Sequence, residues 1–237
     1  MRDIFVGELV GTFLLILLGA SVVANVNLKK SGMYGAGPIQ ITIAWGLAVM
    51  VPAYIFGSMS GASFNPALTI ALAFKGDVAW NQVPVYILGQ MLGAFLGACL
   101  TFVLFKDHYD LEEDAEVCRG TFCTAPSIPN TGRNLLSEIV GTFVLCFAIF
   151  GLSQVEVAGL SGVDKLLVYG IIVSIGMSFG GLTGYAINPA RDLGPRIAYA
   201  ILPFKHKTDP NWSYGWIPVV GPIIGGIIAV VVYNLVF

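Results

Sequence analysis

The chain has 237 residues, of which 56% are hydrophobic and only 11% are charged, and its mean hydropathy is +0.81. Soluble domains carry about 25% charged residues, so this composition excludes a soluble globular protein and indicates an integral membrane protein. The net charge of −2 gives no support for a nucleic-acid partner, and the length fits one membrane domain over 1–237 without a soluble enzyme domain.

Apolar runs long enough to cross a membrane recur along the chain. They predict helical spans at 4–26, 38–56, 84–105 and 135–154, a fifth span that begins at 166, and a sixth at 216–237. The polar stretch between the third and fourth spans contains an acidic run at 110–116, which we interpret as a solvated loop. The sequence therefore predicts an all-α membrane protein with six transmembrane helices.

Two segments, 58–74 and 180–196, interrupt this pattern. Each has a glycine-rich lead-in followed by the tripeptide Asn-Pro-Ala, once as Asn65, Pro66 and Ala67 and again as Asn188, Pro189 and Ala190. Asparagine is a good N-cap and proline suits the first helical position, so each tripeptide predicts the start of a short helix. Two such helices of about 15 Å, placed cap to cap, would cross about 30 Å of hydrocarbon. Capping alone would explain one tripeptide, whereas two favour a pore.

The chain is an internal repeat. The motif that begins at Glu8 returns at Glu138, and the glycine motif that begins at Gly89 returns at Gly221. We therefore divide the domain into a first repeat (1–105), a connecting loop (106–134) and a second repeat (135–237). Three spans per repeat is an odd number, so the second copy must enter the membrane from the opposite side, as in inverted-repeat transporters and channels.

The four cysteines predict no disulfide framework and no metal site. Cys99 and Cys146 lie in apolar runs and are expected to be buried. Cys118 and Cys123 share the polar loop, and two possibilities stay open for them: a disulfide, if the loop faces an oxidising space, or two free thiols. No nucleophile–base pair and no cofactor motif is present, so nothing indicates an enzyme.

The doubled tripeptide, the doubled glutamate motif and Arg191 after the second tripeptide together resemble the aquaporin family, also called major intrinsic proteins, and within it the aquaglyceroporin (glycerol facilitator) branch. The resemblance covers nearly the whole chain. It implies six spans, two re-entrant half-helices, one pore per subunit and usually a homotetramer. It also implies a place in the lipid of the plasma membrane with both termini in the cytoplasm. The positive-inside rule argues against that orientation, because most lysines and arginines would then lie outside.

The resemblance also implies roles for individual residues. The selectivity filter would consist of Trp45, Gly176, Tyr185 and Arg191. The ladder of pore carbonyls would come from Gly61, Ala62, Ser63, Thr183, Gly184 and Tyr185. The re-entrant loops would be supported by Glu8, Glu138 and Asp192. Arg196 lies at i+4 from Asp192, within pairing reach. Taken alone, Trp45 would be a core or interface aromatic residue, and Asn65 and Asn188 would be buried helix caps.

The expected filter has a readable chemistry. Trp45 and Tyr185 offer an apolar corner for a carbon skeleton, and Arg191 offers donors for hydroxyl groups. Gly176 has no side chain and is expected to leave the filter wider. Two positions depart from the family pattern. Ser63 stands where a histidine is usual, and Tyr185 replaces a phenylalanine, so its hydroxyl is expected to narrow the filter.

These features favour a passive channel for glycerol and other small neutral solutes, with some water permeability. Two alternatives remain. Inverted repeats and broken helices also suit a secondary transporter, in which Glu8 and Glu138 would couple transport to protons. The second alternative is a mainly water-selective channel.

Overall fold

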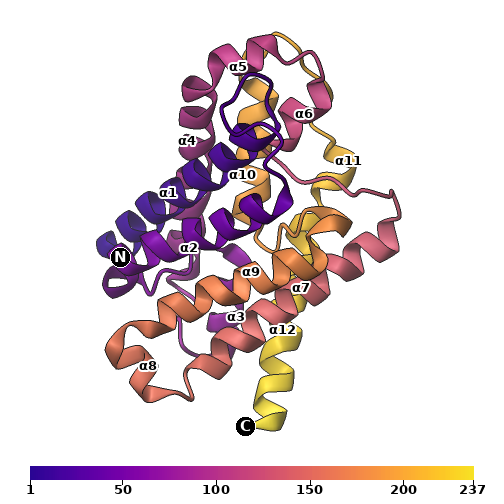
Figure 1. Cartoon of the computed structure of the whole chain (residues 1–237). Coiled ribbons are helices and arrows are strands. Elements are labelled where there is room, and N and C mark those ends of the chain that lie inside the picture. The colour runs from indigo at the N-terminus through magenta and orange to yellow at the C-terminus, as the bar shows by residue number, and fades with distance from the viewer.

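The computed structural model describes all 237 residues, and every regular element in it is a helix. The structure contains six long apolar helices, which pack against one another at different tilts (Figure 1). They are α1 (Arg2–Asn27), α2 (Pro38–Ser60), α4 (Val83–Leu104), α7 (Thr131–Leu152), α9 (Val163–Thr183) and α12 (Ile217–Val236). All six are long and apolar enough to cross a membrane, the last together with the short helix α11 (Trp212–Gly215) that leads into it. The predicted all-α architecture with six spans is confirmed.

Two shorter helices begin where the sequence places them, α3 (Pro66–Lys75) and α10 (Pro189–Ile201). In each, an asparagine side chain caps the helix, because the Oδ1 atom of Asn65 accepts a hydrogen bond from Ala67 N–H and that of Asn188 accepts from Ala190 N–H. Proline occupies the first helical position in both. The local rules of helix capping therefore set these two starts.

The two repeats pack in the same way. The most extensive helix contacts are α1 against α4 in the first repeat and α7 against α12 in the second. Both crossings are close because a glycine faces a backbone carbonyl. A Cβ atom added at Gly93 would lie 2.2 Å from the Leu9 oxygen, and one added at Gly225 would lie 2.2 Å from the Ile139 oxygen. Small residues of this kind let membrane helices approach one another.

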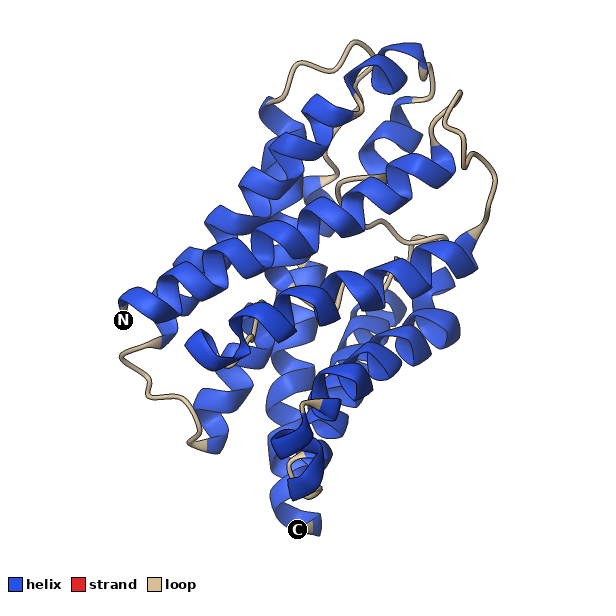
Figure 2. Cartoon of the chain, turned by 60° about the vertical axis from the view of Figure 1, so that its left-hand side comes forward, coloured by secondary structure: helices blue, strands red, loops and turns tan.

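The two ends of the bundle differ. Both termini and the short helix α8 (Glu156–Ser161) lie at one end, and the connecting loop, with α5 (Lys106–Leu111) and α6 (Ala115–Gly120), lies at the other (Figure 1). Figure 2 shows the loops gathered at these two ends. The long axis of the bundle therefore runs from the α8 end to the α5–α6 end.

The connecting loop is more ordered and more buried than the sequence predicts. Glu112, in the acidic run, is 2% exposed and forms an ion pair of 3.0 Å with Lys29 from the first loop. The interpretation of this run as a solvated loop is therefore wrong at Glu112, because the loop folds back onto the bundle. A cluster of aromatic rings joins the loop to the bundle: Tyr109 and Phe122 of the loop pack with Phe102, Tyr199 and Phe204.

Cys118 and Cys123 are buried beside this cluster, and both are free thiols. The disulfide alternative is therefore wrong. Burial raises the pKa of the Cys118 thiol to about 11 and that of the Cys123 thiol to about 12. Both groups thus stay protonated and weakly reactive at neutral pH.

Candidate functional site

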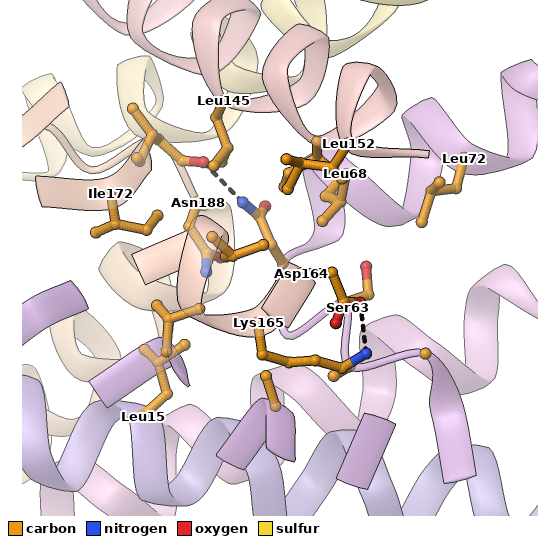
Figure 3. A pocket seen from close by; sticks show the side chains of 18 of the residues that line it. Leu15, Ser63, Leu68, Leu72, Leu145, Leu152, Asp164, Lys165, Ile172 and Asn188 are labelled. Carbon is orange, nitrogen blue, oxygen red and sulfur yellow. Dashed lines mark hydrogen bonds and ion pairs between the residues drawn. The ribbon is translucent and has the colours of Figure 1, made fainter. Parts of the chain in front are cut away.

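A cavity of about 430 Å³ lies between the two repeats. Arg191 borders it together with Trp45 and Tyr185, at the end where the Arg191 side chain reaches the connecting loop. Glu156 of α8 borders it at the other end, together with Asp164 and Lys165 at the start of α9. Between these ends its wall is mainly apolar, and apolar side chains of both repeats face the same space as Asn188 (Figure 3). They include Leu15, Leu68, Leu72, Leu145, Leu152 and Ile172.

The two asparagines meet at the middle of this cavity and tie the repeats together. Asn65 donates a hydrogen bond of 2.8 Å from Nδ2 to the Ile187 carbonyl, and Asn188 donates one of 2.8 Å to the Phe64 carbonyl. An amide nitrogen carries two hydrogens, so each asparagine keeps one donor for a molecule in the cavity. The N-terminal ends of α3 and α10 point toward the same place, and each brings about half a positive charge there.

The backbone that leads into each half-helix is unusual and repeats closely. In the first repeat Gly61, Ala62 and Phe64 have φ values of 77°, 56° and 48°. The equivalent positions of the second repeat, Gly184, Tyr185 and Ile187, have φ values of 77°, 37° and 44°. Non-glycine residues in this region cost of order 1–3 kcal/mol each, so the surrounding structure must hold the loops in place.

The expected set of carbonyl residues is only partly found at the cavity. Gly61, Ala62 and Ser63 border it in the first repeat. In the second repeat Thr183 and Gly184 do not, and the bordering residues are Tyr185, Ala186, Ile187 and Asn188. Sequence reasoning missed Ala186 and Ile187. Counting equal distances back from the two asparagines would have found Ala186, because it is the counterpart of Ser63.

The two glutamates support these loops directly. The carboxylate of Glu8 accepts hydrogen bonds from the backbone N–H groups of Ser63 (3.0 Å) and Phe64 (2.7 Å). Glu138 accepts from the N–H groups of Ala186 (3.0 Å) and Ile187 (2.8 Å). Both carboxylates are almost fully buried, and neither borders the cavity.

Side chains complete each of these networks. Ser60 and Gln90 also donate to Glu8, at 2.6 and 2.7 Å, and Thr183 donates to Glu138 at 2.7 Å. The Thr183 side chain thus holds the glutamate. Sequence reasoning missed Ser60 and Gln90, because nothing local in the sequence marks a polar residue as the partner of a distant carboxylate.

Arg191 is held beside Trp45 at the end of the cavity nearest the connecting loop. Its guanidinium carbon lies 4.1 Å from the centroid of the Trp45 ring, and its Nη1 donates a hydrogen bond of 3.3 Å to the Phe122 carbonyl of the connecting loop. Stacking on an aromatic face suits arginine and leaves its remaining donors free. Phe122 is a further contributor that the sequence did not reveal.

Gly176 and Tyr185 share one space, and this changes the expected filter. A Cβ atom at Gly176 would lie 2.6 Å from Thr42 Cγ2 and 2.8 Å from Tyr185 Cζ. Gly176 does not border the cavity, so the glycine makes room for the Tyr185 ring and not for the permeant. The Tyr185 hydroxyl is buried on that side, beside Thr42, and has no hydrogen-bond partner within 3.5 Å. The expectation that this hydroxyl narrows the pore therefore has no support in the geometry.

Asp192 and Arg196 form the expected pair, with both side chains 0% exposed and an Nε–Oδ1 distance of 2.8 Å. Ser63 borders the cavity, and its hydroxyl lies 2.8 Å from that of Thr69. A small hydrogen-bonded hydroxyl therefore occupies the position where the family usually has an imidazole.

Six apolar spans, two capped half-helices and a cavity between inverted repeats define a membrane pore protein. The chain belongs to the major intrinsic protein family, whose model matches residues 2–233. It is 52% identical to the glycerol uptake facilitator protein of Bacillus subtilis over 98% of this chain and 84% of that protein. It is 50% identical to the probable glycerol uptake facilitator protein of Thermotoga maritima over 99% of this chain and all of that protein. The structure of the aquaglyceroporin from Plasmodium falciparum matches with a TM-score of 0.83 at 29% identity, over 98% of this chain and 95% of that one.

Proposed function

We propose that this protein is a passive channel for glycerol and other small neutral solutes, with some water permeability. The observation that carries the proposal is the end of the cavity nearest the connecting loop, where the Arg191 guanidinium carbon lies over the Trp45 ring, 4.1 Å from its centroid. This arrangement combines hydrogen-bond donors with an apolar wall, which suits a molecule that has hydroxyl groups along one edge and carbons along the other. The facilitator names of the relatives support the same substrate.

In this proposal the filter consists of Trp45, Tyr185 and Arg191, with Gly176 behind the tyrosine ring. Carbonyl groups of both lead-in loops accept hydrogen bonds from the passing solute. Asn65 and Asn188 donate to it at the middle. The positive ends of α3 and α10 raise the energy of a cation there, which favours neutral solutes.

The surroundings of the two glutamates favour a channel over a secondary transporter. A proton-coupling carboxylate must reach the transported molecule or a water chain. The carboxylate oxygens of Glu8 and Glu138 instead accept hydrogen bonds from backbone and side-chain donors away from the cavity. We assign them a structural role.

The chain is proposed to work as a homotetramer in the plasma membrane, with both termini in the cytoplasm. Large apolar side chains are exposed on the outer faces of α2 and α9, including Leu47, Val51, Leu166 and Met177. Such faces suit either lipid or another subunit. The orientation rests on the family resemblance. The distribution of lysines and arginines in the loops favours the opposite orientation.

The test is solute flux into proteoliposomes, measured by stopped-flow light scattering without any ion gradient. We expect fast glycerol entry that is unaffected by proton or sodium ionophores. The Arg191→Ala variant should admit larger polyols than the unmodified protein. Glycerol uptake that required an ion gradient would support the transporter instead, and water flux without glycerol flux would support the water-selective channel.

A further inference from the structure

Thr124, a connecting-loop residue outside every sequence motif, makes an unusual set of bonds. Its backbone N–H and its hydroxyl both donate to Asp192 Oδ2, each at 2.7 Å. Its carbonyl accepts a hydrogen bond of 2.9 Å from Arg196 Nη2. All of its polar groups are thus bound to the buried Asp192–Arg196 pair of α10.

The same residue touches the second re-entrant loop. A Cβ atom added at Gly184 would lie 3.1 Å from Thr124 Cγ2, so the threonine methyl covers that glycine. Gly184 immediately precedes Tyr185 of the proposed filter. Thr124 therefore lies between the ion pair on one side and the lead-in to the filter on the other.

Two residues earlier, the connecting loop supplies the carbonyl that holds Arg191. Phe122 accepts the Arg191 hydrogen bond and is itself fully buried against the rings of Tyr199 and Phe204. The segment from Phe122 to Thr124 is thus fixed at both ends, by aromatic packing and by the ion pair. The aromatic packing fixes the Phe122 ring, whereas the direction of its carbonyl also depends on the anchor at Thr124, two residues further on, so loss of that anchor would turn the carbonyl away from Arg191.

We propose that Thr124 is a positioning residue for selectivity: it fixes the Phe122 carbonyl through Asp192 and thereby holds Arg191 at the edge of the pore. The inference rests on the proposed filter. If the Thr124 hydroxyl is removed, Asp192 still accepts hydrogen bonds from the Thr124 N–H and from Arg196, so the fold persists. The Thr124 side chain then loses its hydrogen bond to Asp192 and keeps only its packing against Gly184. A released guanidinium can swing into the opening, which obstructs glycerol more than water.

The test compares glycerol and water fluxes in the same proteoliposomes for Thr124→Val, Thr124→Ala and Thr124→Ser. Loss of one hydrogen bond to a charged group should lower the glycerol-to-water ratio about threefold or more in the valine and alanine variants. The serine variant keeps the hydroxyl and should stay within about twofold of the unmodified protein. Alanine has no atom that crowds Asp192, so it remains informative if the valine variant fails to fold.

Thr121→Val is the matched control. Thr121 lies in the same loop and is equally buried, but its hydroxyl bonds Tyr109 and the Cys118 carbonyl and not Asp192. It should leave the flux ratio unchanged, whatever its effect on thermal stability. An equal fall of the glycerol-to-water flux ratio in Thr121→Val and Thr124→Val would overturn the inference. A fall of this ratio in Thr124→Ser as large as that in Thr124→Val would overturn it as well.

Arg191→Lys separates this inference from the filter on which it depends. Lysine cannot stack and donate in the same way as arginine, so the flux ratio should change. A changed ratio in Arg191→Lys with an unchanged ratio in both Thr124→Val and Thr124→Ala would overturn the role of Thr124 alone. An unchanged ratio in Arg191→Lys would overturn the proposed filter and this inference together.

Discussion

Tyr185 shows how one backbone angle decides what a side chain does. Its φ of 37° turns the side chain so that the ring lies against Gly176 and Gly180 of α9. A Cβ atom at either glycine would approach the ring to 3.0 Å or less. The ring therefore fits only because two glycines stand one helical turn apart, and its hydroxyl is carried beyond them into the packed protein.

The first prediction concerns that hydroxyl. Because it is buried without a partner, Tyr185→Phe should leave thermal stability unchanged or raise it, since a buried unsatisfied polar group costs about 1–3 kcal/mol. The size limit for polyols should also stay the same. The measurement is stopped-flow flux for three-, four- and five-carbon polyols, together with a thermal unfolding curve. A clear gain for five-carbon polyols would show that the hydroxyl reaches the pore.

The second prediction concerns Gly176→Ala. The added methyl would collide with Thr42 and Tyr185, so the ring must move toward the cavity, and overpacking of this kind costs about 1–3 kcal/mol. Glycerol flux should fall more than water flux, and Gly176→His should act in the same direction more strongly. Gly170→Ala is the control, because it lies on the same helix with no atom within 4 Å of an added Cβ. Equal losses of both fluxes in Gly176→Ala would indicate general misfolding.

Single residues were predictable from the sequence where the repeat marked them. Glu8 and Glu138 stand out because charge is expensive in a membrane span and because the motif is doubled. The direction of the Tyr185 side chain was not predictable, since a positive φ at a tyrosine leaves no signal in composition or spacing. The role of Thr124 was not predictable either, because its partners on α10, Asp192 and Arg196, are 68 and 72 residues away.

At the level of elements, the glycine motifs of the two repeats do the same work. Gly93 brings α4 onto α1, and Gly225 brings α12 onto α7. These glycines belong to a motif that occurs in both repeats of the sequence, so the pairing of equivalent helices was predictable. The connecting loop was not, because its short helices depend on aromatic residues that lie far apart along the chain.

The third prediction follows from these crossings. Gly93→Ala and Gly225→Ala each place a methyl 2.2 Å from a backbone oxygen, which no side-chain rotation can relieve. Each helix pair must separate, so both variants should lower the unfolding temperature in detergent and the yield of monodisperse protein, with a cost of at least about 1–3 kcal/mol. Gly181→Ala, which has open space around it, should behave like the unmodified protein. Similar stability in all three variants would mean that the crossings tolerate expansion.

At the level of the whole molecule, the inverted repeat places two like dipoles head to head. Neither half alone would raise much of a barrier, but α3 and α10 together bring about one positive charge to the middle of the cavity. The crossed bonds from Asn65 and Asn188 keep the two ends in register. The exclusion of cations that we propose therefore depends on both repeats together.

The last prediction tests this barrier with Asn65→Asp. The aspartate can still cap α3 through Ala67, but it adds one negative charge where the two helix ends supply about one positive charge. It also replaces the Nδ2 group of Asn65, which donates to the Ile187 carbonyl, with an oxygen that cannot donate. The net charge at the middle falls to about zero, so proton or cation leakage should rise by about tenfold or more while glycerol still passes. Asn188→Asp should behave alike, because the repeats are equivalent there.

The measurement is the rate of internal pH change in vesicles that contain a pH-sensitive dye and are driven by a potassium potential with valinomycin. Asn130→Asp is the matched control, since Asn130 also caps a helix through its side chain but lies outside the cavity. It should leave the vesicles as tight as the unmodified protein does. If both pore variants are equally tight, the barrier cannot lie at the half-helix ends, and Arg191 at the outer constriction becomes the charge that excludes cations.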